Sequence, residues 1–97
     1  MATVSRSLLW EGTLEPLETR WATWNYNIYG NVLYFYAVPS VGQNSFPQAI
    51  EIQQVRMEHT EAIRWRARIK LHNPTPPRNI PQQDVLFYEM YLVVVSP

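Results

Sequence analysis

Residues 63–72 alternate between apolar and polar side chains without a break, and this alternation constrains the fold more than any other feature. Apolar residues occupy one set of positions: Ile63, Trp65, Ala67, Ile69 and Leu71. Basic side chains occupy the other: Arg64, Arg66, Arg68, Lys70 and His72. Because successive side chains of a β-strand point to opposite faces, the pattern predicts an antiparallel strand with one face buried and the other in water.

The preceding segment is the expected partner of that strand, provided that its own alternation is interrupted once. Ile50 and Ile52 share one face, but Val55 and Met57 have the opposite parity. A β-bulge at residues 53–54 inserts one extra residue and returns both pairs to the same face.

A tight turn at residues 60–62 then sets the register of the hairpin. The inner face pairs apolar side chains: Val55 with Ala67, Ile52 with Ile69, and Ile50 with Leu71. The outer face pairs opposite charges, which stabilise neighbouring strands: Glu58 with Arg64, and Glu51 with Lys70. In this register Arg56 lies opposite Arg66, and the cations left without a carboxylate are Arg56, Arg66 and Arg68.

Further segments have the composition of strands, at residues 7–14, 20–28, 31–38 and 85–95. The proline-rich residues 73–81 cannot form a strand ladder, because proline lacks a backbone N–H. Roughly five to seven short strands with turn signals between them predict an all-β fold. We expect a single compact antiparallel β-sandwich over residues 1–97, with a small β-barrel as the alternative.

Residues 48–95 follow a recognisable order of motifs. The segment IEIQQV precedes the alternating RWRARIKLHNP, and a loop then leads into the aromatic-rich VLFYEMYLVVV. This order resembles the last strands of small immunoglobulin-like modules, in which a strand ending in Asn and Pro or Gly leads through a loop into an aromatic-rich strand. The resemblance implies an immunoglobulin-like sandwich and carries over no site residue. The disulfide and central tryptophan of antibody-type domains are absent.

The composition excludes several classes of protein. Eight basic residues balance eight acidic residues, so no overall positive field attracts nucleic acid or an anionic membrane. The absence of cysteine excludes a disulfide framework and a Cys-ligated zinc. The N-terminal apolar run of three residues is too short for a signal peptide, so we expect cytoplasmic synthesis. The apolar stretch 86–95 is shorter than the roughly 20 residues of a membrane helix.

Catalytic groups are scarce in this chain. Only two histidines are present, His59 beside a turn and His72 on the outward row, and Asp84 is the single aspartate. Glu11, Glu15 and Glu18 surround a loop without an apolar setting that would raise a carboxyl pKa. We therefore expect no enzymatic activity, no metal site and no cofactor.

An aromatic and amide cluster is the candidate ligand site: Trp21, Trp24, Asn25, Tyr26 and Asn27. Carbohydrate sites combine a flat ring with amides, and aromatic residues also anchor protein interfaces. The alternative is that these rings fill the core. Trp21 and Trp24 have opposite parity, so in a regular strand at least one lies near the surface.

A surplus of apolar residues predicts association. Residues 31–38 and 85–95 are apolar on both faces, whereas a two-layer sandwich buries one face of each sheet. The surplus on the last strand is either Phe87, Tyr91, Val93 and Val95 or the intervening Leu86, Tyr88, Met90, Leu92 and Val94. The candidate interface or anion contacts are Arg56, Arg66, Arg68, Phe87 and Tyr91.

The leading interpretation is a homo-oligomeric binding or assembly module. The alternatives are a carbohydrate-binding lectin and a structural subunit of a larger particle. A second copy of the chain is the main expected partner, followed by carbohydrate or another protein; nucleic acid is not expected.

Overall fold

A computed structural model describes residues 3–26, 31–40, 42–43, 48–61, 64–79 and 85–96. These residues form strands and connecting segments, with no helix among them. The strands are β1 (Thr3–Leu14), β2 (Thr19–Tyr26), β3 (Val32–Pro39), β4 (Glu51–Glu61), β5 (Arg64–His72) and β6 (Leu86–Ser96). The predicted all-β class is therefore confirmed.

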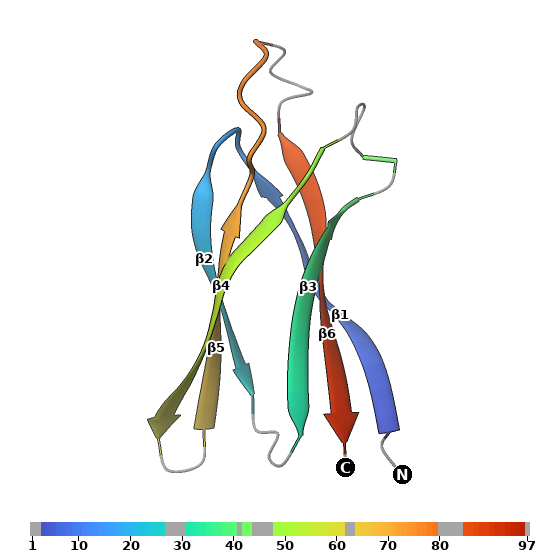
Figure 1. Cartoon of the computed structure of the whole chain (residues 1–97), viewed down its shortest axis with the longest axis vertical. Helices are drawn as coiled ribbons and strands as arrows, with labels where there is room; N and C mark the ends of the chain where they lie inside the picture. Colours follow the sequence, from blue (N-terminus) through green and yellow to red (C-terminus); the bar gives the residue numbers. More distant parts are fainter. Residues whose placement is uncertain are drawn as a thin grey trace.

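The strands form two antiparallel three-stranded sheets (Figure 1). Sheet A has the order β1-β6-β3, and sheet B has the order β2-β5-β4. Except for the β4–β5 hairpin, each connection along the chain passes from one sheet to the other. The molecule is elongated, with extents of 47 × 28 × 16 Å, and both termini lie at the same end (Figure 1).

The two sheets share one hydrophobic core, and their central strands supply most of it. The fully or nearly fully buried cluster comprises Leu14, Ile69, Leu71, Leu86, Tyr88 and Met90. Alternation along β6 settles which half of its apolar residues faces inward: Leu86, Tyr88, Met90 and Leu92 are buried. Phe87, Tyr91, Val93 and Val95 therefore belong to the outer face of sheet A.

Gly12 has no side chain, and the large core residue Tyr88 occupies the space beside it. A Cβ atom on Gly12 would lie 2.6–2.8 Å from the ring and hydroxyl of Tyr88, closer than carbon atoms approach in proteins. The Tyr88 hydroxyl accepts a hydrogen bond from Trp10 Nε1 at 3.1 Å. The missing side chain thus makes room for a buried tyrosine whose polar atom has a partner.

Asn73 fastens the junction between the sheets. Its Nδ2 donates to the carbonyl oxygens of Leu14 and Glu15, at 3.3 and 3.2 Å, and its Oδ1 accepts from the Thr75 N–H at 3.1 Å. Its own N–H donates to the Glu18 carbonyl at 3.0 Å. Asn73 is completely buried, so these bonds satisfy a polar group that water cannot reach.

The β4–β5 hairpin confirms the predicted bulge and corrects the predicted register. The ladder shifts between Ile52 and Gln54, as expected. However, Val55 lies opposite Ile69 instead of Ala67, and Ile52 lies opposite Leu71 instead of Ile69. The hairpin closes with Glu61 opposite Arg64, farther along the chain than predicted, and after the irregularity between His59 and Glu61 the pairing is displaced by two residues. A displacement of two residues keeps every side chain on its predicted face. Ile63 lies outside the described residues.

Candidate functional site

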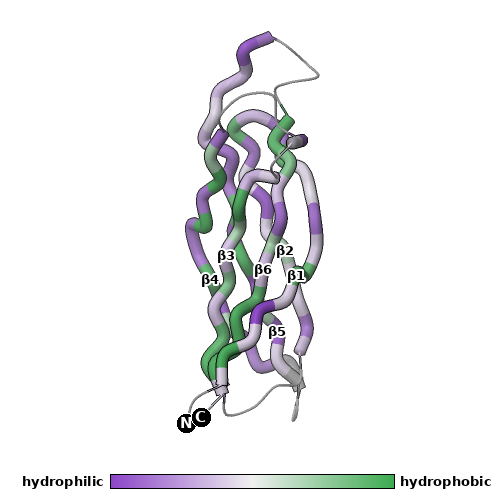
Figure 2. Tube along the Cα trace, turned by 90° about the vertical axis from the view of Figure 1, so that its right-hand side faces the viewer, coloured by the Kyte–Doolittle hydropathy of each residue, from purple (hydrophilic) through white to green (hydrophobic). Residues whose placement is uncertain are grey.

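The outer face of sheet A, called here the apolar face, is the first candidate site. It carries Val4, Arg6, Leu8, Glu11 and Thr13 from β1, Phe87, Glu89, Tyr91, Val93 and Val95 from β6, and Val32, Tyr34, Tyr36 and Val38 from β3. Large apolar side chains on it are well exposed: Val4 66%, Tyr34 57%, Val32 52%, Leu8 49% and Val38 36%. In Figure 2 hydrophobic stretches of β3 and β6 lie toward the end that holds the termini.

Two stacked tyrosines occupy the centre of the apolar face. The rings of Tyr36 and Tyr91 lie 5.0 Å apart at an interplanar angle of 15°. The Arg6 guanidinium lies 5.2 Å from the centre of the Tyr91 ring, and its Nη1 donates to the Tyr36 hydroxyl at 3.4 Å. Burial raises the pKa of the Tyr91 phenol above its usual 10.0, and the charge of Glu89 acts in the same direction. The centre is therefore flat, aromatic and partly shielded from water.

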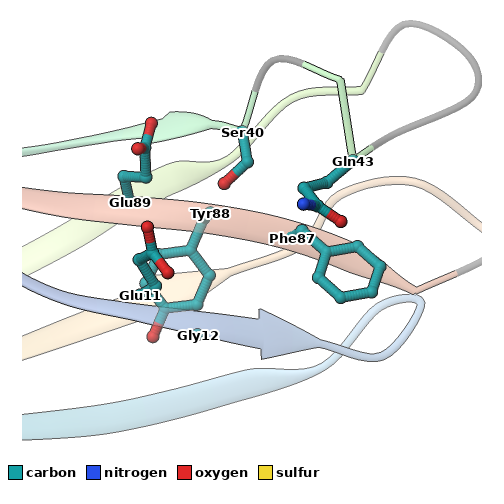
Figure 3. A pocket seen from close by; sticks show the side chains of 7 residues that line it. All are labelled: Glu11, Gly12, Ser40, Gln43, Phe87, Tyr88 and Glu89. Carbon is teal, nitrogen blue, oxygen red and sulfur yellow. The ribbon is translucent and has the colours of Figure 1, made fainter.

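Two carboxylates face the same hollow at one end of the apolar face. Glu11 and Glu89 lie directly opposite each other on β1 and β6, and Figure 3 shows them on adjacent strands. The hollow has a volume of about 400 Å³ and is lined by Glu11, Gly12, Ser40, Gln43, Phe87, Tyr88 and Glu89. Like charges directly opposite on neighbouring strands destabilise a sheet, so this end is suited to receive a cation.

The outer face of sheet B, called here the basic face, is the second candidate site. At its centre, the Arg66 Nη2 lies 2.6 Å from Glu58 Oε2, while Arg56 and Arg68 each lie 3.6 Å from Oε1. The hydrogen bond from Arg66 lowers the pKa of the Glu58 carboxyl below its usual 4.5, and the charges of Arg56 and Arg68 also lower it. A single carboxylate thus gathers three cations.

These contacts correct the predicted ion pairs. Glu58 lies opposite Arg66 instead of Arg64, and Arg56 lies opposite Arg68 instead of Arg66. Glu51 lies opposite His72 instead of Lys70. The prediction that Arg56, Arg66 and Arg68 lack a carboxylate is wrong, because the two-residue shift of the hairpin brings all three to Glu58.

Trp21 extends the basic face onto β2. Arg68 lies 4.8 Å and Lys70 5.9 Å from the centre of the indole ring. Asn25 lies on the same side of β2 as Trp21, opposite Arg66. Trp21 and Asn25 therefore belong to one outward surface that joins an indole, an amide and several cations.

The other predicted ligand residues lie on the opposite face of β2. Trp24 and Tyr26 stack at 5.2 Å and 12°, and Trp24 meets Phe35 of sheet A edge-on at 5.9 Å. Burial raises the pKa of the Tyr26 phenol. The predicted cluster is thus divided between the interior and the basic face, as the parity of Trp21 and Trp24 requires. Asn27 lies outside the described residues.

The histidines have structural neighbours. The His59 ring lies 4.8 Å from the Trp65 ring. His72 Nδ1 is hydrogen-bonded to the Thr19 hydroxyl at 2.9 Å and lies 3.2 Å from the Glu18 carbonyl. In the part of the chain that the structure describes, no group of three or more His, Asp or Glu side chains could hold a metal ion.

Sequence reasoning missed the roles of Arg6, Glu11, Glu89 and Tyr36. The alternation of side chains shows that these residues share a face with Tyr91, but only when the pairing of β1 and β3 with β6 is known. The bulge between Leu8 and Trp10 hides that relation on β1, because it shifts the alternation by one residue.

No family model, curated protein or solved structure matches this chain. No helix in the described ranges has the length and hydropathy that crossing a membrane requires.

Proposed function

We propose that this protein is a non-catalytic, immunoglobulin-like β-sandwich that works as a homo-oligomeric binding or assembly module. The observation that carries the proposal is the apolar face. In this assignment a second copy of the chain covers the outer face of sheet A, and the basic faces of the two copies point away from each other.

The strand orders support the immunoglobulin-like assignment. Constant-type immunoglobulin domains place strands A, B, E and D in one sheet and C, F and G in the other. If β2 to β6 are strands B to F, sheet B has the order B-E-D, and β3 and β6 form the C-F pair. Strand β1 then lies beside β6, where strand G would be.

The chemistry of the apolar face supports association. Fully burying one large apolar side chain contributes about 1.5–3 kcal/mol relative to leaving it in water. Val4, Leu8, Val32 and Tyr34 are each about half exposed or more. Covering them therefore gives a substantial driving force, which the basic face does not offer.

The size of the apolar face sets the expected strength of association. A central strand of 11 residues, with a rise of about 3.4 Å per residue and strand spacings of about 4.8 Å, gives roughly 500 Å² for three strands. Two copies would then bury roughly 1,000 Å², slightly below the usual size of specific interfaces. The expected assembly is thus concentration-dependent.

Light scattering over a range of concentrations tests the proposal. The wild-type chain should reach at least twice its 11.4 kDa mass at high micromolar concentration. Tyr34→Lys places a charge on the apolar face and should return the mass to that of one chain. Thr23→Lys places the same charge at an exposed position of the basic face and should leave the mass unchanged. A wild-type mass of one chain throughout would contradict the proposal.

Carbohydrate binding is the second candidate function, and Trp21 is the observation that favours it. Its indole lies beside Asn25 on the same face and beneath the cations Arg68 and Lys70, a combination suited to an anionic sugar. Trp21→Ala should abolish binding on a glycan array while the fold persists. Trp24→Ala, which removes a ring packed against Phe35, should act mainly on stability.

A further inference from the structure

The apolar face carries matching charges on the two sides of its central row. Tyr91 and Leu8 are paired across β6 and β1. Arg6 is opposite Val93, two residues from Tyr91 along β6, and Glu11 is opposite Glu89, two residues from Tyr91 in the other direction. The cation and the carboxylates are therefore equally far from the tyrosine row, about 7 Å along the strands.

Neither charge has an ionic partner among the described residues. The salt bridges there join Arg20 to Glu18, and Arg56, Arg66 and Arg68 to Glu58. Arg6 donates a hydrogen bond to Tyr36 and lies over the ring of Tyr91. Glu11 and Glu89 line a hollow of about 400 Å³, and Glu89 is also hydrogen-bonded to the Tyr91 phenol.

From these positions we infer the geometry of the homodimer: two apolar faces stack with their strands antiparallel, related by a two-fold axis that crosses the strands at the Leu8–Tyr91 row. This rotation keeps β1 over β1 and reverses its direction. Arg6 of each copy then lies over Glu11 and Glu89 of the other, and each Tyr91 meets its equivalent. The inference rests on the proposed function, because it names the arrangement of that same assembly.

Charge selects this arrangement over the other two-fold stacking. An axis along β6 would keep each row over the same row and would put β1 over β3, so Glu89 would lie over its own equivalent and Glu11 over Val38. Like charges brought together across an interface are unfavourable. With the axis across the strands, the same rotation forms two equivalent Arg–carboxylate contacts, as an isologous interface requires.

Single cysteine variants test the axis directly, because the chain contains no cysteine. A short bis-maleimide suits facing sheets, which pack about 10 Å apart. Leu8→Cys should cross-link to its own equivalent, since it lies on the axis. Val95→Cys, two rows away on β6, should not, because the reversal puts its equivalent roughly 27 Å away. Efficient linking of Val95→Cys without Leu8→Cys would overturn the inferred axis.

Charge exchange gives an independent readout. Arg6→Glu and Glu11→Arg should each weaken the dimer by at least about tenfold, and the double variant should recover most of the loss. Sedimentation of the wild-type chain separates the two proposals. A wild-type monomer contradicts the proposed function, whereas a wild-type dimer that is insensitive to these substitutions contradicts only the inferred arrangement.

Discussion

The outer faces of sheets A and B have the same architecture and opposite chemistry. Each sheet has three antiparallel strands and a central strand that contributes to the shared core. On sheet B, the outward positions of the central strand hold Arg66, Arg68 and Lys70; on sheet A, they hold Tyr91, Val93 and Val95. The topology is therefore the same for both faces, and the residues at alternate positions determine their different chemistry.

The two outer faces also differ in how their charged side chains are placed. On the basic face, Glu58 gathers Arg56, Arg66 and Arg68 within the chain. On the apolar face, Arg6 and the pair Glu11 and Glu89 lie about 14 Å apart along β1, a distance that separates them. The first arrangement is complete in one copy, and the second would become complete only in the proposed dimer.

The largest expected effect comes from substitutions in the interior, which the two sheets share although their outer faces differ. Met90 on β6 and Ile69 on β5 are both fully buried. Met90→Ala and Ile69→Ala should each lower the free energy of unfolding by about 2–5 kcal/mol. Chemical denaturation should show one transition in both variants. Two separate transitions would mean that the sheets are stabilised independently.

The next effect concerns the junction that joins the sheets. Asn73→Ala removes the side-chain donor to the buried Leu14 carbonyl and one of the two donors to the Glu15 carbonyl, which should cost about 1–3 kcal/mol. Asn25→Ala, at an exposed amide of the basic face, should change stability by no more than about 0.5 kcal/mol. Equal costs in the two variants would contradict the structural role of Asn73.

Much of the fold could be predicted from the sequence, because burial follows parity. The inward positions Ala67, Ile69 and Leu71 are buried as the alternation predicts, and the bulge lies before Gln54. The register could not be predicted, because a shift of two residues keeps every side chain on its face. The register depends on the hairpin closing at Glu61 and Arg64 and on the irregularity next to His59, and neither leaves a signal in the hydropathy pattern.

The sequence also predicts the candidate site only in part. Apolar residues on both sides of β6 indicated a surplus, but the choice between the two sets depended on which side sheet B covers. The pairing of Arg6 with Val93 and of Glu11 with Glu89 depends on contacts between distant strands. A local pattern therefore predicts that a face exists, and tertiary pairing decides what it contains.

Acid should affect the basic face through Glu58. Its pKa in the folded chain is below the usual 4.5 because Arg66 stabilises the charged form. The resulting stabilisation is present above about pH 4.5 and is lost as the pH falls through the lower folded pKa. Glu58→Gln should flatten this part of the urea-midpoint profile. An unchanged acid limb in the variant would contradict the role of Glu58.

Alkali should affect the apolar face through Tyr91. Its folded pKa is above the usual 10.0, chiefly because of burial, so its stabilisation is present below about pH 10.0 and is lost as the pH rises through the folded value. Tyr91→Phe should reduce the alkaline loss of stability, measured in dilute solution where one chain predominates. Tyr26→Phe serves as the comparison, because burial also raises the pKa of that interior tyrosine.

The smallest effect concerns the turn that carries the chain from sheet A to sheet B. The Glu18 N–H donates to the Glu15 carbonyl at 3.1 Å, and Leu17 adopts a φ of 59° with its side chain 53% exposed. A Cβ atom in this left-handed conformation costs about 1 kcal/mol. Leu17→Gly removes that cost, whereas Leu17→Ala removes the same exposed side chain and keeps the Cβ. Glycine loses more backbone entropy on folding, which offsets part of this gain. The free energy of unfolding of the glycine variant should therefore exceed that of the alanine variant by only a few tenths to about 1 kcal/mol, measured by thermal unfolding. Equal stability of the two variants would mean that the turn relaxes around the Cβ, and that the passage between the two sheets stores no strain at Leu17.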